Sequence, residues 1–165
     1  RNVAQNPSDQ EGRLALANAS TMAGTAFSNS MVGCVHSMGH ATGAVAHVPH
    51  GIAMNIFLPF GLEFNLERRA DLIADLLLPL AGADVYAATP ADQRARQTIA
   101  EVRRLKEDLH ASTGLARSLQ EAGVKPEQLE DIAKLAINDG SAMMNPEELR
   151  VEDALALAKR AYEHG

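Results

Sequence analysis

The spacing of apolar side chains constrains the fold of this chain most, because it follows a helical period almost throughout. In residues 11–26, apolar and small side chains recur three or four positions apart, the spacing that places them on one face of an α-helix. No stretch alternates apolar and polar residues as a half-buried strand would. We find no internal repeat and no low-complexity tract. The pattern predicts an all-α fold.

The same periodicity predicts a helical bundle of about seven helices. They are expected at residues 11–26, 29–46, 52 to a kink or break at Pro59, 66–78, 90–110, 126–137 and 151–162. Ser8 or Asp9 can cap the first helix, and Thr89 can cap the fifth, with Pro90 in its first turn. Residues 79–90 are expected to form a linker, and residues 138–146 have the composition of a loop.

Length and composition limit the class of protein. With 165 residues, of which 46% are apolar, the chain can form one domain with a core but not two ordinary enzyme domains. A net charge of -6 argues against a nucleic-acid or anionic-membrane surface. No run approaches the roughly 18 apolar residues of a membrane span, and no signal peptide opens the chain. We therefore expect a soluble, cytoplasmic protein, and the start at Arg1 leads us to expect a piece of a longer chain.

Four histidines occur within one short stretch. His36 and His40 are four residues apart, so a helix places both imidazoles on one face, and His50 follows in a Pro-His-Gly turn. A single histidine on an apolar helix is usually a hydrogen-bonded core residue, but three at this spacing favour a site for a divalent metal. His47 is expected to be exposed or to lie behind the ligands.

Other candidate groups receive structural interpretations. His110 and His164 lie near predicted helix C-termini, where a cation interacts favourably with the helix dipole. Cys34 lies two positions from His36, about 200° around a helix, and is expected to face away and pack as a small hydrophobe. As the only cysteine, it excludes an internal disulfide and fits a reducing compartment. Glycines among the histidines each cost a helix about 1 kcal/mol, so they require a packing or functional reason.

At these residues the sequence resembles the iron-containing (group III) alcohol dehydrogenases. That family carries a Gly-x-x-His-x-x-x-His-x-x-Gly segment followed by a Pro-His-Gly turn. The matching positions are Gly33, His36, His40, Gly43 and Pro49-His50-Gly51, with Ala26-Phe27-Ser28-Asn29, Leu58-Pro59, Asn65 and Asn145-Pro146 around them. The resemblance covers essentially the whole chain and implies the helical, dehydroquinate synthase-like C-terminal domain of such an enzyme.

The resemblance also implies residue roles. His36 and His50 would bind the metal, and His40 would relay a proton or orient the substrate. Phe27 would line the substrate pocket, and Ser141 would lie in a loop that closes against it. The implied reaction is hydride transfer between a primary or small alcohol or aldehyde and NAD(P), with the metal polarising the substrate oxygen. Neutral histidine suits Fe²⁺ and Zn²⁺ equally, and the resemblance favours iron.

One departure from the family limits this interpretation. Complete members have an N-terminal domain that binds the dinucleotide and supplies a metal-binding aspartate and a further histidine, and no strand followed by a glycine-rich turn occurs here. Residues 1–165 are thus expected to be the C-terminal metal-binding domain, inactive alone, with NAD(P) bound mainly by the absent N-terminal domain. An exposed apolar surface is expected where that partner docks, and the family makes a homo-oligomer the expectation.

Two alternatives stay open at this point. One is a maleylacetate reductase-like relative of the same fold. The presence of both His36 and His50 argues against a branch of the family that has lost its metal, but not against this relative. The other is a self-sufficient helical metal-binding protein without catalysis. It would need a fourth ligand, for which Asp139, Asn138 and His47 are the candidates.

Overall fold

The computed structural model describes residues 2–163, and every regular element within that range is a helix. The predicted all-α fold is therefore confirmed. The structure has eleven α-helices and two 3-10 helices in the described range, compared with the seven or so expected. Most of the additional ones are the four- to six-residue helices α1, α6, α7 and α10, which are too short to show a helical period in the sequence.

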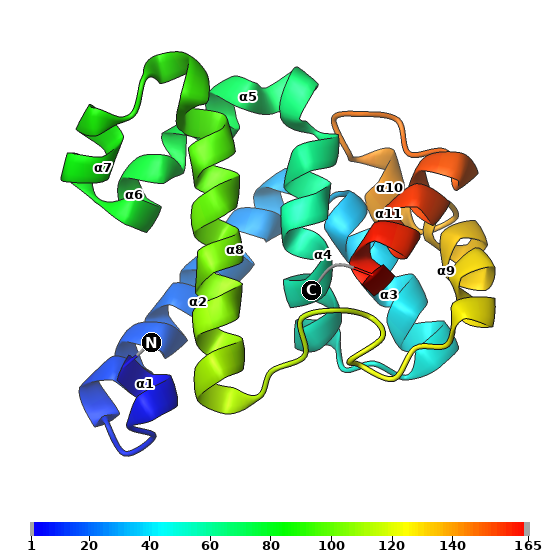
Figure 1. The fold of residues 1–165 in the computed structure, drawn as a ribbon, viewed down its shortest axis with the longest axis horizontal. Helices are drawn as coiled ribbons and strands as arrows, with labels where there is room; N and C mark the ends of the chain where they lie inside the picture. The colour runs from blue at the N-terminus through cyan, green and yellow to red at the C-terminus, as the bar shows by residue number, and fades with distance from the viewer. Residues whose placement is uncertain (1, 164–165) are drawn as a thin grey trace.

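Most of the helices follow one another with short connections, and the longest connection is residues 114–125 (Figure 1). In chain order they are α1 (Asn2–Gln5), α2 (Gln10–Ser30), α3 (Cys34–Ala46), α4 (His50–Phe64), α5 (Leu66–Asp75), α6 (Leu77–Ala81), α7 (Ala83–Ala88), α8 (Arg94–Thr113), α9 (Leu129–Ala136), α10 (Gly140–Met143) and α11 (Val151–Glu163). The 3-10 helices are Ala91–Gln93 and Pro126–Gln128. In Figure 1 the long helix α8 stands between α6 and α7 on one side and α3, α4, α9, α10 and α11 on the other, and α5 lies at the top between α8 and α4.

The main core lies among α3, α4, α9 and α11. Its largest fully buried side chains include Phe57, Phe60, Met38, Ile56 and Ile132. Helices α3 and α4 approach closely because of glycines: a Cβ at Gly39 would overlap the end of the Met54 side chain, and one at Gly61 would overlap Val35 Cγ2. The expected packing reason for a glycine within the histidine helix is thus found at Gly39.

The predicted helix over residues 29–46 is wrong at its start. Helix α2 continues to Ser30, and three non-helical residues separate it from α3. Met31, which ends α2, has a positive φ of 62°, and Gly33, before α3, is extended. This change of direction frees α3 to pack on α4 instead of continuing α2. The polar run Ser28-Asn29-Ser30 and Gly33 flank the break and are residues typical of turns, but helical periodicity alone did not indicate it.

The predicted break at Pro59 is also wrong. Helix α4 continues to Phe64, and Pro59 is buried within it. Proline cannot donate to the carbonyl four residues earlier, which costs one hydrogen bond. Burial of Pro59 together with Phe57 and Phe60 offsets that loss. At its other end, α4 begins with His50 itself, so Pro49-His50-Gly51 is the start of a helix and not a separate turn.

The remaining boundaries differ in smaller ways. The predicted helix over residues 66–78 divides at Leu76 into α5 and α6, and the predicted linker contains α7. Thr89 does not cap α8, because its hydroxyl donates to the Val85 carbonyl and a 3-10 turn precedes Arg94. The predicted loop over 138–146 contains the short helix α10. Asp9 does cap α2, accepting from Gly12 N at 2.9 Å.

Helix α2 is unusual because none of its 21 residues is buried. Leu14, Met22 and Phe27 are 62%, 72% and 51% exposed on it. Further leucines, including Leu72 and Leu76, are exposed on the α5–α6 side. Leu135, Met143 and Met144 are exposed as well, so exposed apolar side chains, as expected from the sequence, lie in several places. No described helix combines the length and apolar character needed to span a membrane.

Candidate metal and catalytic site

The three histidines singled out in the sequence lie together on α3 and α4. His36 and His40 are one turn apart on α3, and His50 is the first residue of α4. The chain returns because His47 ends α3 in the left-handed conformation, with φ of 57°. The ring centroids are 5.7 Å apart for His36–His40, 5.6 Å for His36–His50 and 5.4 Å for His40–His50. The structure thus forms a triangle of imidazoles, which we call the histidine triangle.

The electrostatics of the histidine triangle favour neutral imidazole at His36. Partial burial lowers the pKa of His36, and the neighbouring His40 and His50 lower it further, while Asp139 acts in the opposite direction. Its ring is therefore neutral at pH 7, which is the form that can ligate a metal. His40 and His50 are more exposed, at the open side of the triangle.

His40 has a specific partner. Its Nδ1 lies 2.9 Å from Asp139 Oδ2, in the residue that precedes α10. Asp139 Oδ1 also accepts from Ser141 N at 2.7 Å and so caps α10. Burial opposes ionisation of Asp139, but the hydrogen bonds from Ser141 and His40 hold its pKa below the usual range. A carboxylate only accepts, so Nδ1 of His40 carries a proton and Nε2 of the neutral ring is free to accept one.

The histidine triangle fits part of a metal site. Two imidazoles on one tetrahedral metal have ring centres about 5 Å apart, given metal–nitrogen bonds of roughly 2 Å. The 5.6 Å between the His36 and His50 rings is close to that separation. Within residues 2–163, however, no three or more His, Cys, Asp or Glu side chains are arranged to hold a metal by themselves. The described residues therefore do not form a complete metal site of three or more such side chains by themselves.

The other candidate ligands do not complete the set. His47 is exposed at the end of α3, and Asn138 is exposed with its amide donating to the Lys134 carbonyl. Cys34 is buried, and burial raises the pKa of its thiol to about 11 against the opposing hydrogen bond from Asn65. A thiol that stays protonated is a poor metal ligand. The prediction that Cys34 packs as a small hydrophobe is confirmed by its burial.

Ser141 and Phe27, the two residues expected at a substrate pocket, differ from each other in position and burial. Ser141 is buried at the start of α10, next to the partner of His40. Phe27 is half exposed near the end of α2. A depression of about 250 Å³ borders the site and is lined by His40, Leu135 and Asp139, among others. A larger cavity of about 490 Å³ lies between α1 and α2 on one side and α6 and α8 on the other, away from the histidine triangle, and is lined mainly by apolar and small side chains.

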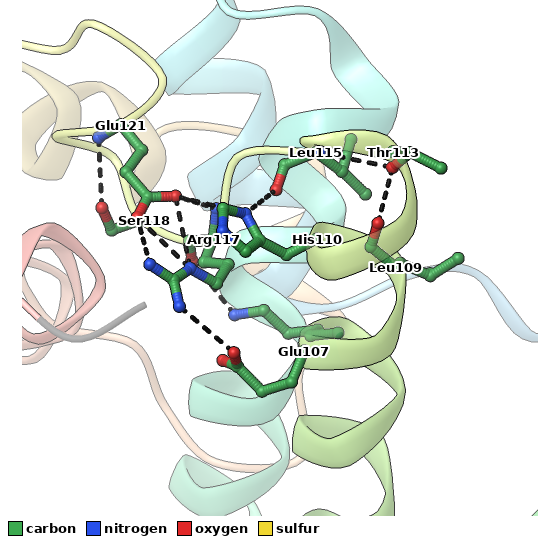
Figure 2. Close-up of polar contacts among 9 residues, drawn as sticks. Glu107, Leu109, His110, Thr113, Leu115, Arg117, Ser118 and Glu121 are labelled. Atoms are coloured by element: carbon green, nitrogen blue, oxygen red, sulfur yellow. Dashed lines mark hydrogen bonds and ion pairs between the residues drawn. The ribbon is translucent and has the colours of Figure 1, made fainter.

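His110 lies near a helix C-terminus, as predicted from the sequence. In the last turn of α8, its Nδ1 lies 3.0 Å from the Leu115 carbonyl and 3.9 Å from Glu121 Oε2 (Figure 2). Arg117 pairs with Glu121 and with Glu107, so the loop after α8 is tied back to the helix. These contacts account for His110 without chemistry. His164, the other histidine given this interpretation, lies outside the described residues.

Comparison with known proteins gives consistent similarities. Residues 1–162 match the family described as Fe-containing alcohol dehydrogenase family, C-terminal. The chain is 32% identical to the 1,3-propanediol dehydrogenase of Klebsiella pneumoniae over 94% of its length, and 34% identical to the NAD-dependent methanol dehydrogenase of Bacillus methanolicus over 94%. It spans only 38% and 39% of those two relatives.

A solved structure shows the same fold. The alcohol dehydrogenase from Oenococcus oeni superposes with a TM-score of 0.87 at 28% identity, covering 98% of this chain and 40% of that one. The sequence match, the all-α fold and the structural similarity agree over nearly the whole chain. The chain belongs to the Fe-containing alcohol dehydrogenase family, and it matches the C-terminal part of that family.

Proposed function

We propose that this chain is the C-terminal metal-binding domain of an NAD(P)-dependent alcohol dehydrogenase. The observation that carries the proposal is the histidine triangle, with ring centroids 5.4–5.7 Å apart, in a chain of the Fe-containing alcohol dehydrogenase family. The reaction is hydride transfer between a primary or small alcohol or aldehyde and the nicotinamide. Two relatives are named for methanol and for 1,3-propanediol, which are small primary alcohols.

In this proposal, His36 and His50 supply two neutral nitrogens to the metal. A bound divalent metal polarises the substrate oxygen as a Lewis acid. The low pKa of His36 keeps its ring available at neutral pH. Fe²⁺ is the proposed metal on family grounds, and Zn²⁺ suits the same nitrogens.

His40, oriented by Asp139, is proposed to transfer the proton of the alcohol. With its Nδ1 proton held by Asp139 Oδ2, His40 can accept the alcohol proton at Nε2, while the hydride leaves the carbinol carbon for the nicotinamide. The carboxylate then stabilises the imidazolium that forms. In the reverse direction, Nε2 returns the proton to the aldehyde oxygen. Ser141, beside Asp139, and Phe27, on α2, are proposed to face the substrate.

The binding of NAD(P) and the remaining metal ligands are assigned to a part of the protein outside residues 1–165. The two relatives are much longer than this chain, which supports an N-terminal domain that binds NAD(P) and supplies further metal ligands. The exposed leucines and Phe27 of α2 would be covered by that domain. We also propose that the protein forms a homo-oligomer and is cytoplasmic.

An anaerobic titration of Fe²⁺ and Zn²⁺ into metal-stripped residues 1–165 tests this function. Weak binding that His36→Ala and His50→Ala both abolish, and that tightens in a chain carrying the N-terminal domain, is the expected result. His47→Ala should leave the affinity unchanged. Tight one-to-one binding by residues 1–165 alone would instead favour the self-sufficient metal protein, and unchanged affinity in His36→Ala would remove the metal from the proposal. In a chain carrying the N-terminal domain, assays of alcohol oxidation with NAD(P)⁺ and of maleylacetate reduction with NAD(P)H distinguish the reductase alternative.

A further inference from the structure

We infer that Asn145, held in a reciprocal pair with Asn65, is a positioning residue that fixes the N-terminal end of α3 and with it the place of His36. The inference rests on the proposed function, because it assigns Asn145 a role in that site. Both asparagines lie outside the histidine triangle, and the mechanism above does not use them. The two side chains exchange hydrogen bonds with each other and with three further segments of backbone.

The Asn145 amide is fully used. Its Oδ1 accepts from Cys34 N at 3.0 Å and from Asn65 Nδ2 at 3.0 Å. Its Nδ2 donates to Asn65 Oδ1 at 2.8 Å and to the Glu147 carbonyl at 2.7 Å. A partly buried amide with two acceptor and two donor contacts has only one orientation that satisfies them all.

Asn65 extends the network to a third segment. It ends α4, and its Nδ2 also donates to the Gly61 carbonyl at 3.0 Å and contacts Cys34 Sγ at 3.5 Å. Its Oδ1 accepts a further bond from Glu147 N at 3.3 Å. The pair therefore joins the start of α3, the end of α4 and the loop that follows α10. We call these contacts the asparagine latch.

Helix α3 depends on the latch for its N-terminal cap. The first turn of a helix has backbone N–H groups without partners inside the helix, and a side chain at the cap position usually accepts one of them. Here that position is Gly33, which has no side chain. Asn145, 111 residues further along the chain, accepts from Cys34 N instead. A Cβ at Gly33 would lie 2.6 Å from Asn145 Oδ1, so the glycine makes room for the cap.

The position of the latch relates it to the site. His36 is two residues after Cys34, in the turn that the latch holds. Asn145 also follows α10, whose first turn carries Ser141 and is capped by Asp139, the partner of His40. Asn145 N donates to the Ala142 carbonyl at 3.2 Å, which ties the latch to α10. Asn145 is thus bonded both to the helix turn that carries His36 and to α10, which places Asp139 beside His40.

The test compares Asn145→Ala and Asn145→Asp with a variant that weakens the same core elsewhere. Leu157→Ala serves as that control, because Leu157 is buried on α11, which packs on α4 and α9. Imidazole signals in long-range ¹H–¹⁵N spectra of the metal-free full-length protein report the surroundings of His36. Co²⁺ titration of the same proteins, followed by its visible absorption bands, reports the assembled site.

Asn145→Ala is expected to shift the His36 ring signals and to weaken Co²⁺ binding by about 10- to 100-fold, the usual effect of losing a group that orients a ligand. Asn145→Asp keeps an oxygen for Cys34 N but loses both donor contacts of the amide, so it should restore only part of the affinity. Leu157→Ala should lower the melting temperature while leaving signals and affinity as in the wild type. If Asn145→Ala does not fold, Gly33→Ala, whose methyl displaces Asn145 Oδ1, should shift the same His36 signals.

Two results would overturn the inference. One is an Asn145→Ala variant whose His36 signals stay in place. The other is a Leu157→Ala variant that moves the His36 signals and the affinity equally, since the latch would then act only through stability. If the wild type binds no Co²⁺, the metal function fails, and shifted His36 signals in Asn145→Ala still support the positioning role on their own.

Discussion

His40 Nδ1 lies 2.9 Å from Asp139 Oδ2, although 99 residues separate the two in the chain. The contact joins the histidine triangle on α3 and α4 to α10, a helix of four residues. Asp139 also caps α10, because it accepts from Ser141 N. The same carboxylate therefore orients the His40 imidazole and holds α10 in place. This double role allows orientation and anchoring to be separated by substitution.

Asp139→Asn should lower activity without lowering stability. Asparagine caps helices about as well as aspartate, so the bond from Ser141 N can remain. Its amide does not hold the Nδ1 proton of His40 as a carboxylate does, nor does it stabilise the imidazolium. We expect kcat to fall by about 10- to 100-fold in the full-length enzyme, with the urea midpoint unchanged. An Asp139→Asn enzyme with wild-type kcat would contradict the proton role.

Asp139→Ala is the matched comparison. It removes the cap as well as the carboxylate, so it should cost about 1 kcal/mol of stability in addition to the loss of activity. Urea unfolding at pH 7 followed by circular dichroism measures the difference between the two variants. Equal stability of Asp139→Asn and Asp139→Ala would show that the α10 cap is not a stabilising contact.

The sequence was sufficient for the histidine triangle because each step there is local. His36 and His40 are related by one helical turn, and the short connection after α3 brings His50 back beside them. Helical periodicity likewise predicts the long helices α2 and α8, even though their ends move by a few residues. Local spacing carries this information because both contacts and helices arise from residues close in the chain.

The partners of these residues could not be predicted in the same way. Asp139 was one of three candidates for a metal ligand, and its role as the partner of His40 depends on how α10 packs against α3. Asn145 accepts from the start of α3 across 111 residues, and no local pattern encodes such a pair. The break at Met31, which has a positive φ, was likewise not indicated by helical periodicity.

Glu63→Gln should destabilise the fold at neutral pH but not in acid. Glu63 Oε1 accepts from Arg103 Nη2 at 2.8 Å, and Oε2 pairs with Arg160, so the carboxylate joins α4 to α8 and α11. Burial opposes its ionisation, but these arginines hold the pKa of Glu63 below its usual range. The stabilisation is present above the unfolded-state pKa and is lost as pH falls through the lower folded-state pKa.

Since these side chains are partly exposed, we expect a cost of only about 1 kcal/mol for Glu63→Gln at pH 7. The difference from the wild type should shrink towards pH 3. Urea unfolding at the two pH values measures it. A difference of the same size at both would show that the charge of Glu63 contributes nothing.

Lys106→Met should remove a rise of stability with pH. Lys106 is 4% exposed on α8, with its Nζ 3.2 Å from the Arg117 carbonyl. Burial, with the charges of Arg103 and Arg117, lowers the pKa of Lys106 to about 8 against the opposing Glu107 and Glu121. Between that pKa and the unfolded value of about 10.4, the folded protein binds fewer protons, so stability rises with pH.

The expected gain from Lys106 across this window is about 2 kcal/mol for the wild type and absent in Lys106→Met. At pH 7.5 the variant should be at least as stable as the wild type, because methionine fills the site without the cost of burying a charge. Urea unfolding at pH 7.5 and pH 9.5 is the measurement. Parallel pH dependences in the two proteins would mean that Lys106 titrates normally in the folded state.

Gly61→Ala should loosen the contact between α3 and α4 that places the histidine triangle. A Cβ at Gly61 would overlap Val35 Cγ2 and lie 3.2 Å from Cys34 Sγ, and the branched valine has little freedom to withdraw. We expect a loss of about 1–3 kcal/mol, the usual cost of overpacking, despite the helix preference of alanine. Gly51→Ala is the matched control on the same helix, because a Cβ there meets nothing within 4 Å, and it should be neutral or stabilising. Thermal unfolding of the two variants measures the contrast, and equal melting temperatures would show that α3 and α4 can separate at Gly61 without cost.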